Sequence, residues 1–117
     1  MSTGSTVLRG DLILVHFPFT DLSGQKLRPA LIVGHSAGDD LIVAFITSHT
    51  GTAMTSAEHL LGSADTEFRS TGLKASSVVR LNKIATLHRM LIRRRIGRIG
   101  PRTARAVAGC LRYVFEL

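Results

Sequence analysis

The chain has 117 residues, a length that suits one folded domain around a single hydrophobic core. Hydrophobic residues make up 44% of it and only three prolines interrupt it, which excludes a disordered chain. Fifteen Lys and Arg stand against eight Asp and Glu, which favours a polyanionic partner such as nucleic acid and leaves a membrane-surface or purely solubilising role as alternatives.

The first half of the chain predicts three strands. Residues 11–17 (DLILVHF) are rich in β-formers and meet Pro18, which cannot donate to a sheet ladder. Residues 20–26 (TDLSGQK) predict a loop, and the apolar run at residues 30–33 predicts the second strand. Residues 41–46 (LIVAFI) form a continuous apolar run, which indicates a central strand covered on both faces.

The second half predicts a long loop and then a basic group of strands. Residues 47–72 are polar and small, with one apolar patch at residues 57–61 that predicts a helical turn. Residues 77–81, 84–87 and 91–99 predict three more short strands.

The chain ends in a predicted amphipathic helix. Pro101 suits a first helical position, and apolar residues then recur at helical spacing at Ala104, Val107, Ala108, Leu111 and Phe115. We therefore expect a mostly β fold with one helix (α+β), in which a small curled sheet or barrel is closed on one side by the C-terminal helix. One domain should span residues 1–117, with residues 1–6 disordered because they are small and polar.

Several features concern the compartment. Cys110 is the single cysteine of the chain, so it cannot form an internal disulfide, and its apolar surroundings indicate a small packed hydrophobe. No run approaches the length of a membrane-spanning helix, and the N-terminus lacks the apolar segment of a signal peptide. We expect a cytoplasmic protein that does not contact a membrane.

Four ordered segments resemble the MazF/PemK family of type II toxin–antitoxin toxins. They are GDLILVHFPFTDLSGQKLRPALIV at residues 10–33, LIVAFITS at residues 41–48, GLKASSVVRLNKIATLHRMLIRRRIGRI at residues 72–99, and the C-terminal helix. The resemblance covers nearly the whole chain from Leu8 onward. It implies an SH3-like small β-barrel, a homodimer, inhibition by a cognate antitoxin and DNA binding together with that antitoxin. It also implies an mRNA interferase, an endoribonuclease that cleaves single-stranded RNA without a metal.

Cleavage of RNA without a metal requires the neighbouring 2′-OH to attack phosphorus while the site moves protons and neutralises charge. The sequence shows no His/Cys cluster with zinc spacing and no Asp/Glu constellation suited to magnesium. We therefore expect neither a metal nor another cofactor.

Two residues match the catalytic pair of the family. Arg28 matches the catalytic arginine, where a guanidinium can hold the scissile phosphate, and the alternative is a surface arginine before a strand. Thr47 matches the second site residue, and the alternative is a threonine that caps the turn after a strand.

Arg80 and Asn82 fall where some family members have an arginine and an aspartate that take part in cleavage. An amide cannot act as a general base, so either Asn82 only positions RNA or the proton transfer is done elsewhere. We expect Arg80, Asn82, Lys26 and Ser48 to contact RNA.

His16, at the end of the first strand, is a third catalytic candidate as acid or base, with a structural role as the alternative. His49 and His88 are weaker candidates. Phe17 and Phe19 are expected to stack on a substrate base or an antitoxin side chain, or to anchor the loop.

The basic residues Arg93, Arg94, Arg95 and Arg98 are expected to bind the RNA backbone or an acidic antitoxin segment, with a solvated strand pair as the alternative. Two other functions stay open. One is a non-catalytic barrel of CcdB-like type that poisons gyrase, and the other is an inactive relative that only binds RNA or antitoxin.

Overall fold

The computed structural model describes residues 6–16, 26–51 and 54–117. The expected disorder of residues 1–5, most of the loop at residues 20–26, and the contacts expected of Phe17 and Phe19 lie outside the described residues.

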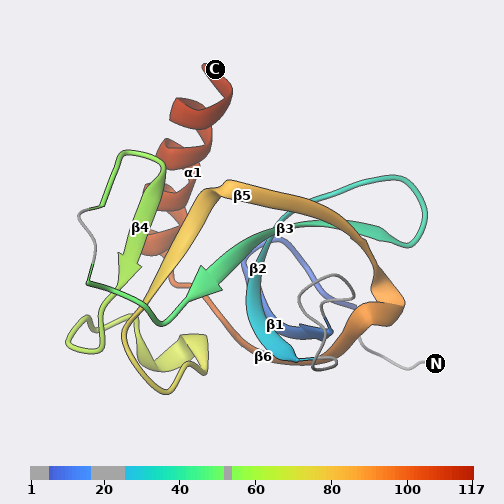
Figure 1. The fold of residues 1–117 in the computed structure, drawn as a ribbon, viewed down its shortest axis with the longest axis horizontal. Helices are drawn as coiled ribbons and strands as arrows, with labels where there is room; N and C mark the ends of the chain where they lie inside the picture. Colours follow the sequence, from blue (N-terminus) through green and yellow to red (C-terminus); the bar gives the residue numbers. More distant parts are fainter. Residues whose placement is uncertain (1–5, 17–25, 52–53) are drawn as a thin grey trace.

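Six antiparallel strands form one curled sheet in the order β4-β5-β3-β2-β1-β6 (Figure 1). The strands are β1 (Asp11–His16), β2 (Leu27–His35), β3 (Asp40–Thr47), β4 (Glu58–Leu61), β5 (Ser77–His88) and β6 (Ile92–Arg98). In the described part of the chain β4 and β6 are the two edges, so the sheet curls as a barrel does without closing. The α+β class expected from the sequence is confirmed.

Two predicted elements were wrong. The helical turn expected at residues 57–61 is strand β4, because its residues pair with β5 from Glu58 opposite Arg80 to Leu61 opposite Ser77. The two strands expected at residues 77–81 and 84–87 are one 12-residue strand, β5. The polar residues between them form a bulge that bends the strand without ending it, because the register with β3 shifts there.

Alternating side chains give the sheet two apolar faces. Ile13 and Val15 point into the curl, whereas Leu12 points to the opposite face, as the period of two along a strand requires. The inner cluster comprises Val7, Ile13, Val15, Ala30, Ile32, Leu41, Val43 and Leu87. The outer cluster comprises Leu12, Leu31, Ala44, Ile46, Leu61, Val79, Leu81, Ile99 and Val107, the last of these from the helix. The helix therefore covers the outer face (Figure 1).

Helix α1 (Pro101–Phe115) starts with proline at its first turn, as predicted. Its N-cap Gly100 has no side chain to bond the free N–H groups, and Glu67 does this from a distant loop. The Glu67 carboxylate accepts from the backbone N–H groups of Arg102 at 3.0 Å and Thr103 at 2.8 Å. Among the described residues no helix combines the length and the apolar character that a membrane crossing requires.

The apolar face of α1 is rotated from the predicted one. Val107 is buried as expected, but Ala104 is exposed and Phe115 is 56% exposed. Thr103 is buried in their place because its N–H and its hydroxyl both donate to Glu67, which turns it inward. Cys110 packs against the outer cluster as a small hydrophobe, and burial raises the pKa of its thiol.

Candidate active site

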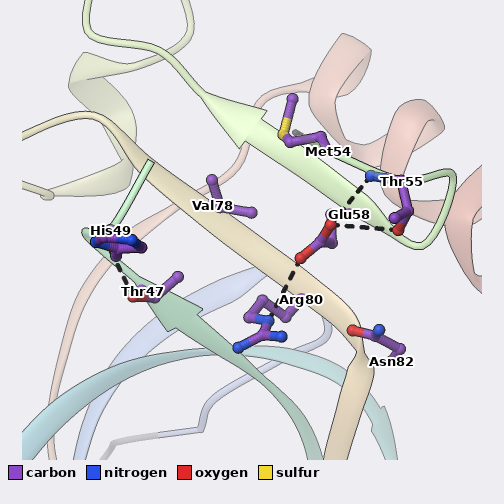
Figure 2. A pocket seen from close by; sticks show the side chains of 8 residues that line it. All are labelled: Thr47, His49, Met54, Thr55, Glu58, Val78, Arg80 and Asn82. Carbon is purple, nitrogen blue, oxygen red and sulfur yellow. Dashed lines mark hydrogen bonds and ion pairs between the residues drawn. The ribbon is translucent and has the colours of Figure 1, made fainter. Parts of the chain in front are cut away.

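A pocket of about 300 Å³ lies where the end of β3 and the first half of β5 meet the edge strand β4 (Figure 2). It contains Thr47, Arg80 and Asn82, which were expected from the sequence to act or to bind RNA, the weaker candidate His49, and residues that were not predicted. Its lining consists of Thr47, His49, Met54, Thr55, Glu58, Val78, Arg80 and Asn82.

The register of the strands brings these side chains together. Thr47 pairs with Val78, and Arg80 pairs with Phe45 on one side and with Glu58 on the other. Residues that are directly opposite in an antiparallel ladder point to the same face. Thr47, Arg80 and Glu58 therefore share one face of the sheet although they come from three strands.

Arg80 and Glu58 point toward one another in the middle of the pocket (Figure 2). Arg80 Nε lies 3.4 Å from Glu58 Oε2, and the side chains are 39% and 15% exposed. The Nε atom is buried and makes no hydrogen bond to the described residues. The other carboxylate oxygen, Oε1, accepts from the backbone N–H of Thr55 at 3.0 Å and from its hydroxyl at 3.2 Å. Glu58 is thus fixed through Oε1 and only loosely paired through Oε2.

β4 is held in place by its neighbours on both sides. The N–H of Leu81 donates to the carbonyl of Ala57 at 2.9 Å, which fixes the start of the strand against β5. The Cys110 thiol of α1 donates to the Glu58 carbonyl at 3.7 Å. The helix and β5 together therefore set the position of the Glu58 side chain.

Thr47 ends β3, and its hydroxyl oxygen accepts the backbone N–H of His49 at 3.1 Å. This contact is the turn cap that was the alternative to a catalytic role for Thr47. It uses an oxygen lone pair and leaves the hydroxyl proton for a further acceptor. The capping contact and a role in the pocket are therefore compatible, and the catalytic role of Thr47 stays a prediction.

Arg28 is exposed on β2 and does not line this pocket. The ladder between β2 and β3 ends at Ala30 opposite Phe45. Alternation along the two strands gives Arg28 the side of Ala30 and Thr47 the side of Phe45, so both belong to one face of the sheet. Arg28 has no ion-pair partner among the described residues.

Lys26 and Ser48 are exposed, Lys26 just before β2 and Ser48 just after β3. Their exposure is compatible with the RNA contacts expected of them, which stay a prediction.

His16 does not share this face. Val15 pairs with Arg28 and His16 with Leu27, so alternation directs His16 to the opposite face of the sheet. Its Nδ1 is buried and makes no hydrogen bond to the described residues. His88 accepts the N–H of Met90 at 3.0 Å and caps a short 3₁₀ helix, η2 (Arg89–Leu91). The geometry gives His16 no link to the pocket, and its catalytic role remains a prediction without support.

Glu58 was missed by the sequence analysis, and His49 was ranked low. The signal for Glu58 lay in strand pairing, because a β4 antiparallel to β5 puts its glutamate opposite Arg80. Assigning residues 57–61 to a helical turn concealed that pair. In the described part of the chain, no three His, Cys, Asp or Glu side chains gather in a way that could hold a metal ion.

The model of a family described as PemK-like, MazF-like toxin of type II toxin–antitoxin system matches residues 8–115 of the chain. The chain belongs to this family. The match covers both the sheet and α1, and the resemblance inferred from the sequence is confirmed. The sequence matches no curated protein.

Solved structures share the fold of this PemK/MazF-like toxin. A mycobacterial endoribonuclease in complex with its cognate antitoxin has a TM-score of 0.72 and 19% identity, over 96% of this chain and 97% of that one. The Mycobacterium tuberculosis toxin MazF-mt6 has a TM-score of 0.69 and 22% identity, over 92% and 97%. MazF of Deinococcus radiodurans, solved with MazE, has a TM-score of 0.69 and 16% identity, over 93% and 95%.

Proposed function

We propose that this toxin is an endoribonuclease that cleaves single-stranded mRNA in the cytoplasm through attack by the ribose 2′-OH, without a metal. One observation supports the proposal: Thr47 and Arg80 line one pocket, and Arg28 belongs to the same face of the sheet. The similar mycobacterial structures are endoribonucleases, which supports the same reaction here.

Each group has a role in this reaction. Arg28 and Arg80 bind the scissile phosphate and neutralise the charge that grows on its oxygens in the transition state. Thr47 donates its hydroxyl proton to a phosphate oxygen and so orients the phosphorus for in-line attack. The products are a 2′,3′-cyclic phosphate and a 5′-hydroxyl end.

The side chains beside the pocket suit a negatively charged strand. Lys26 and Ser48 are exposed next to β2 and β3, and Asn82 lines the pocket. We propose that these residues bind the phosphates and bases next to the cleaved bond, so that recognition depends on an unpaired strand lying across the ends of β2, β3 and β5.

We propose that a cognate antitoxin inhibits the toxin and that two copies of the toxin form the active unit. The mycobacterial endoribonuclease was solved with its antitoxin, and MazF of Deinococcus radiodurans was solved with MazE. On this chain the exposed Arg93 and Arg94 lie on the edge strand β6, where an acidic antitoxin segment can bind them. Light scattering of the toxin alone and with antitoxin tests both assemblies.

The direct test uses purified toxin and single-stranded RNA in EDTA. We expect cleavage with 2′,3′-cyclic phosphate ends, detected by mass spectrometry of the fragments. Intact RNA together with stalled gyrase would support the CcdB-like alternative, and binding without cleavage would identify an inactive relative.

Arg28→Ala tests the mechanism. We expect cleavage to fall at least 100-fold, because removing a group that stabilises transition-state charge costs about 3 kcal/mol. The fold should survive, since Arg28 is exposed. Thermal unfolding is the control for the fold, and an unchanged cleavage rate would remove Arg28 from the mechanism.

A further inference from the structure

The 2′-OH must lose a proton as it attacks. Of the bases predicted from the sequence, His16 is directed to the opposite face of the sheet, and His49 lies beside Thr47, away from the Arg80–Glu58 pair (Figure 2). The amide of Asn82 is not basic enough to accept the proton, and the arginines stay protonated. The described residues that line the pocket include one carboxylate, that of Glu58.

Glu58 has the geometry that a base requires. Two hydrogen bonds from Thr55 hold Oε1, so the carboxylate has a fixed orientation. Oε2 lies 3.4 Å from the Arg80 Nε, which makes no hydrogen bond within the described part of the chain. An anion bound by Arg80 would therefore lie beside Oε2 without displacing any strong contact of the carboxylate.

The position also puts the carboxylate beside the group expected to bind the phosphate. Among the described residues, the charged and titratable groups that line the pocket with Glu58 are Arg80 from β5 and His49 from the segment after β3, and Thr55 hydrogen-bonds to the carboxylate. Arg80 attracts both the carboxylate and a phosphate, so one guanidinium can hold the base and the reacting group side by side.

We propose that Glu58 is the general base of this toxin, a role that rests on the proposed endoribonuclease function. Oε2 takes the proton of the 2′-OH as the O2′–P bond forms. The P–O5′ bond then breaks, and O5′ takes a proton from water, which reaches the open pocket. Glu58 afterwards returns its proton to solvent, so protons and electron pairs balance without an oxidant, reductant or metal.

Glu58→Gln is the main test. Its amide oxygen still accepts the two hydrogen bonds from Thr55, so the pocket keeps its shape while the basic oxygen is lost. We expect kcat to fall at least 100-fold on a single-stranded RNA that the wild type cleaves, the usual contribution of a general base. Affinity for the same RNA with a 2′-deoxy sugar at the cleaved position should stay equal or increase, because a negative charge has left the pocket.

Two further variants sharpen the test. Asn82→Asp in the Glu58→Gln background places a carboxylate back in the same pocket. We expect the double variant to cleave at least tenfold faster than Glu58→Gln alone. Asp39→Asn removes one acidic charge from the exposed turn at the other end of β3 and should leave cleavage unchanged. The wild-type rate should fall as acid protonates the base, and this limb of the pH–rate profile should disappear in Glu58→Gln.

The outcomes separate this proposal from the function on which it rests. If the wild type leaves RNA intact, the endoribonuclease function fails. If the wild type cleaves and Glu58→Gln cleaves at the same rate, only the role of Glu58 fails. A Glu58→Gln variant that loses RNA affinity as much as it loses rate, or that keeps the acidic limb, also overturns the role, because it marks the ion pair as structural.

Discussion

Two of the regions of this toxin that join arginine to a shielded carboxylate differ in how fully the carboxylate is bonded. Asp11, at the start of β1, is 4% exposed in its side chain and accepts from the Leu8 N–H at 2.8 Å. It also lies 2.7 Å from Arg98 Nη1 and 3.1 Å from Arg95 Nε on β6. Glu58 in the pocket is 15% exposed and meets Arg80 at 3.4 Å. The first region joins two strands tightly, and the second leaves its arginine able to bind another anion.

The comparison also divides the basic residues of β6. Arg95 and Arg98 are about half exposed and are paired with Asp11, so part of their charge is used within the fold. Arg93 and Arg94 are exposed and have no ion-pair partner among the described residues. The four arginines expected to bind RNA or antitoxin therefore separate into a structural pair and a pair available to partners.

The largest expected effect comes from removing one arginine from each region and comparing the two variants. Arg80→Ala should lower cleavage roughly 100-fold with little change in stability, because it removes a charge that stabilises the transition state. Arg98→Ala should keep cleavage and lose about 1 kcal/mol of stability, the value of a charge-assisted hydrogen bond at a half-exposed site. Single-turnover cleavage and urea unfolding of both variants measure this. Equal effects of the two variants on both readouts would contradict the division.

Asp11→Ala should lower the free energy of unfolding by roughly 2 kcal/mol. The change orphans the Leu8 N–H and releases both arginines, but their exposure limits the cost to less than that of a fully buried pair. Urea unfolding measures the loss, and Glu58→Gln is the matched variant, expected to lose less than 1 kcal/mol. A larger loss for Glu58→Gln would make its ion pair the structural one.

Acid should destabilise the toxin through the first region. Burial raises the pKa of Asp11, but the Leu8 N–H and the two arginines outweigh it, so the pKa of the folded state lies below its ordinary value. The stability that Asp11 contributes is therefore fully present above the pKa that Asp11 has in the unfolded chain. It is lost as the pH falls through the pKa that Asp11 has in the folded protein. The pKa of Glu67 is also lowered, chiefly by the Thr103 N–H, and acts in the same direction.

The melting temperature should therefore drop as the pH falls below about 4. Asp11→Asn should start from a lower melting temperature and lose less of it in acid, whereas Asp39→Asn should follow the wild type. Thermal unfolding from pH 7 to pH 3 measures both slopes, and an acid slope in Asp11→Asn as steep as that of the wild type would refute the assignment.

Asn82→Asp alone has the smallest expected effect. If position 82 serves proton transfer, a carboxylate there raises the cleavage rate a few-fold while Glu58 is present, since a second base adds little to a step that already has one. Steady-state cleavage at several pH values measures it. An unchanged rate in this variant, together with no restoration in Glu58→Gln, would show that position 82 takes no part in proton transfer.

The sequence predicted the elements whose patterns are long and regular. The strands around residues 11–17 and 41–46 are present, because burial on a sheet repeats every two residues and continuous apolar runs mark covered strands. Proline placed the start of α1 correctly. The resemblance to a family, carried by ordered segments and not by periodicity, supplied the candidates Arg28, Thr47, Arg80 and Asn82.

The sequence could not decide what depends on contacts between distant segments. β4 is a strand because β5 lies beside it, and α1 is rotated because Glu67 bonds to Thr103 across 36 residues. Local propensity does not contain these partners. The amino-acid sequence by itself thus determined a basic chain with an α+β fold and the side chains from which a phosphate site can be built. Only the tertiary structure decided that Glu58 joins Arg80 and that His16 faces away, because register across an antiparallel ladder sets which side chains share a face.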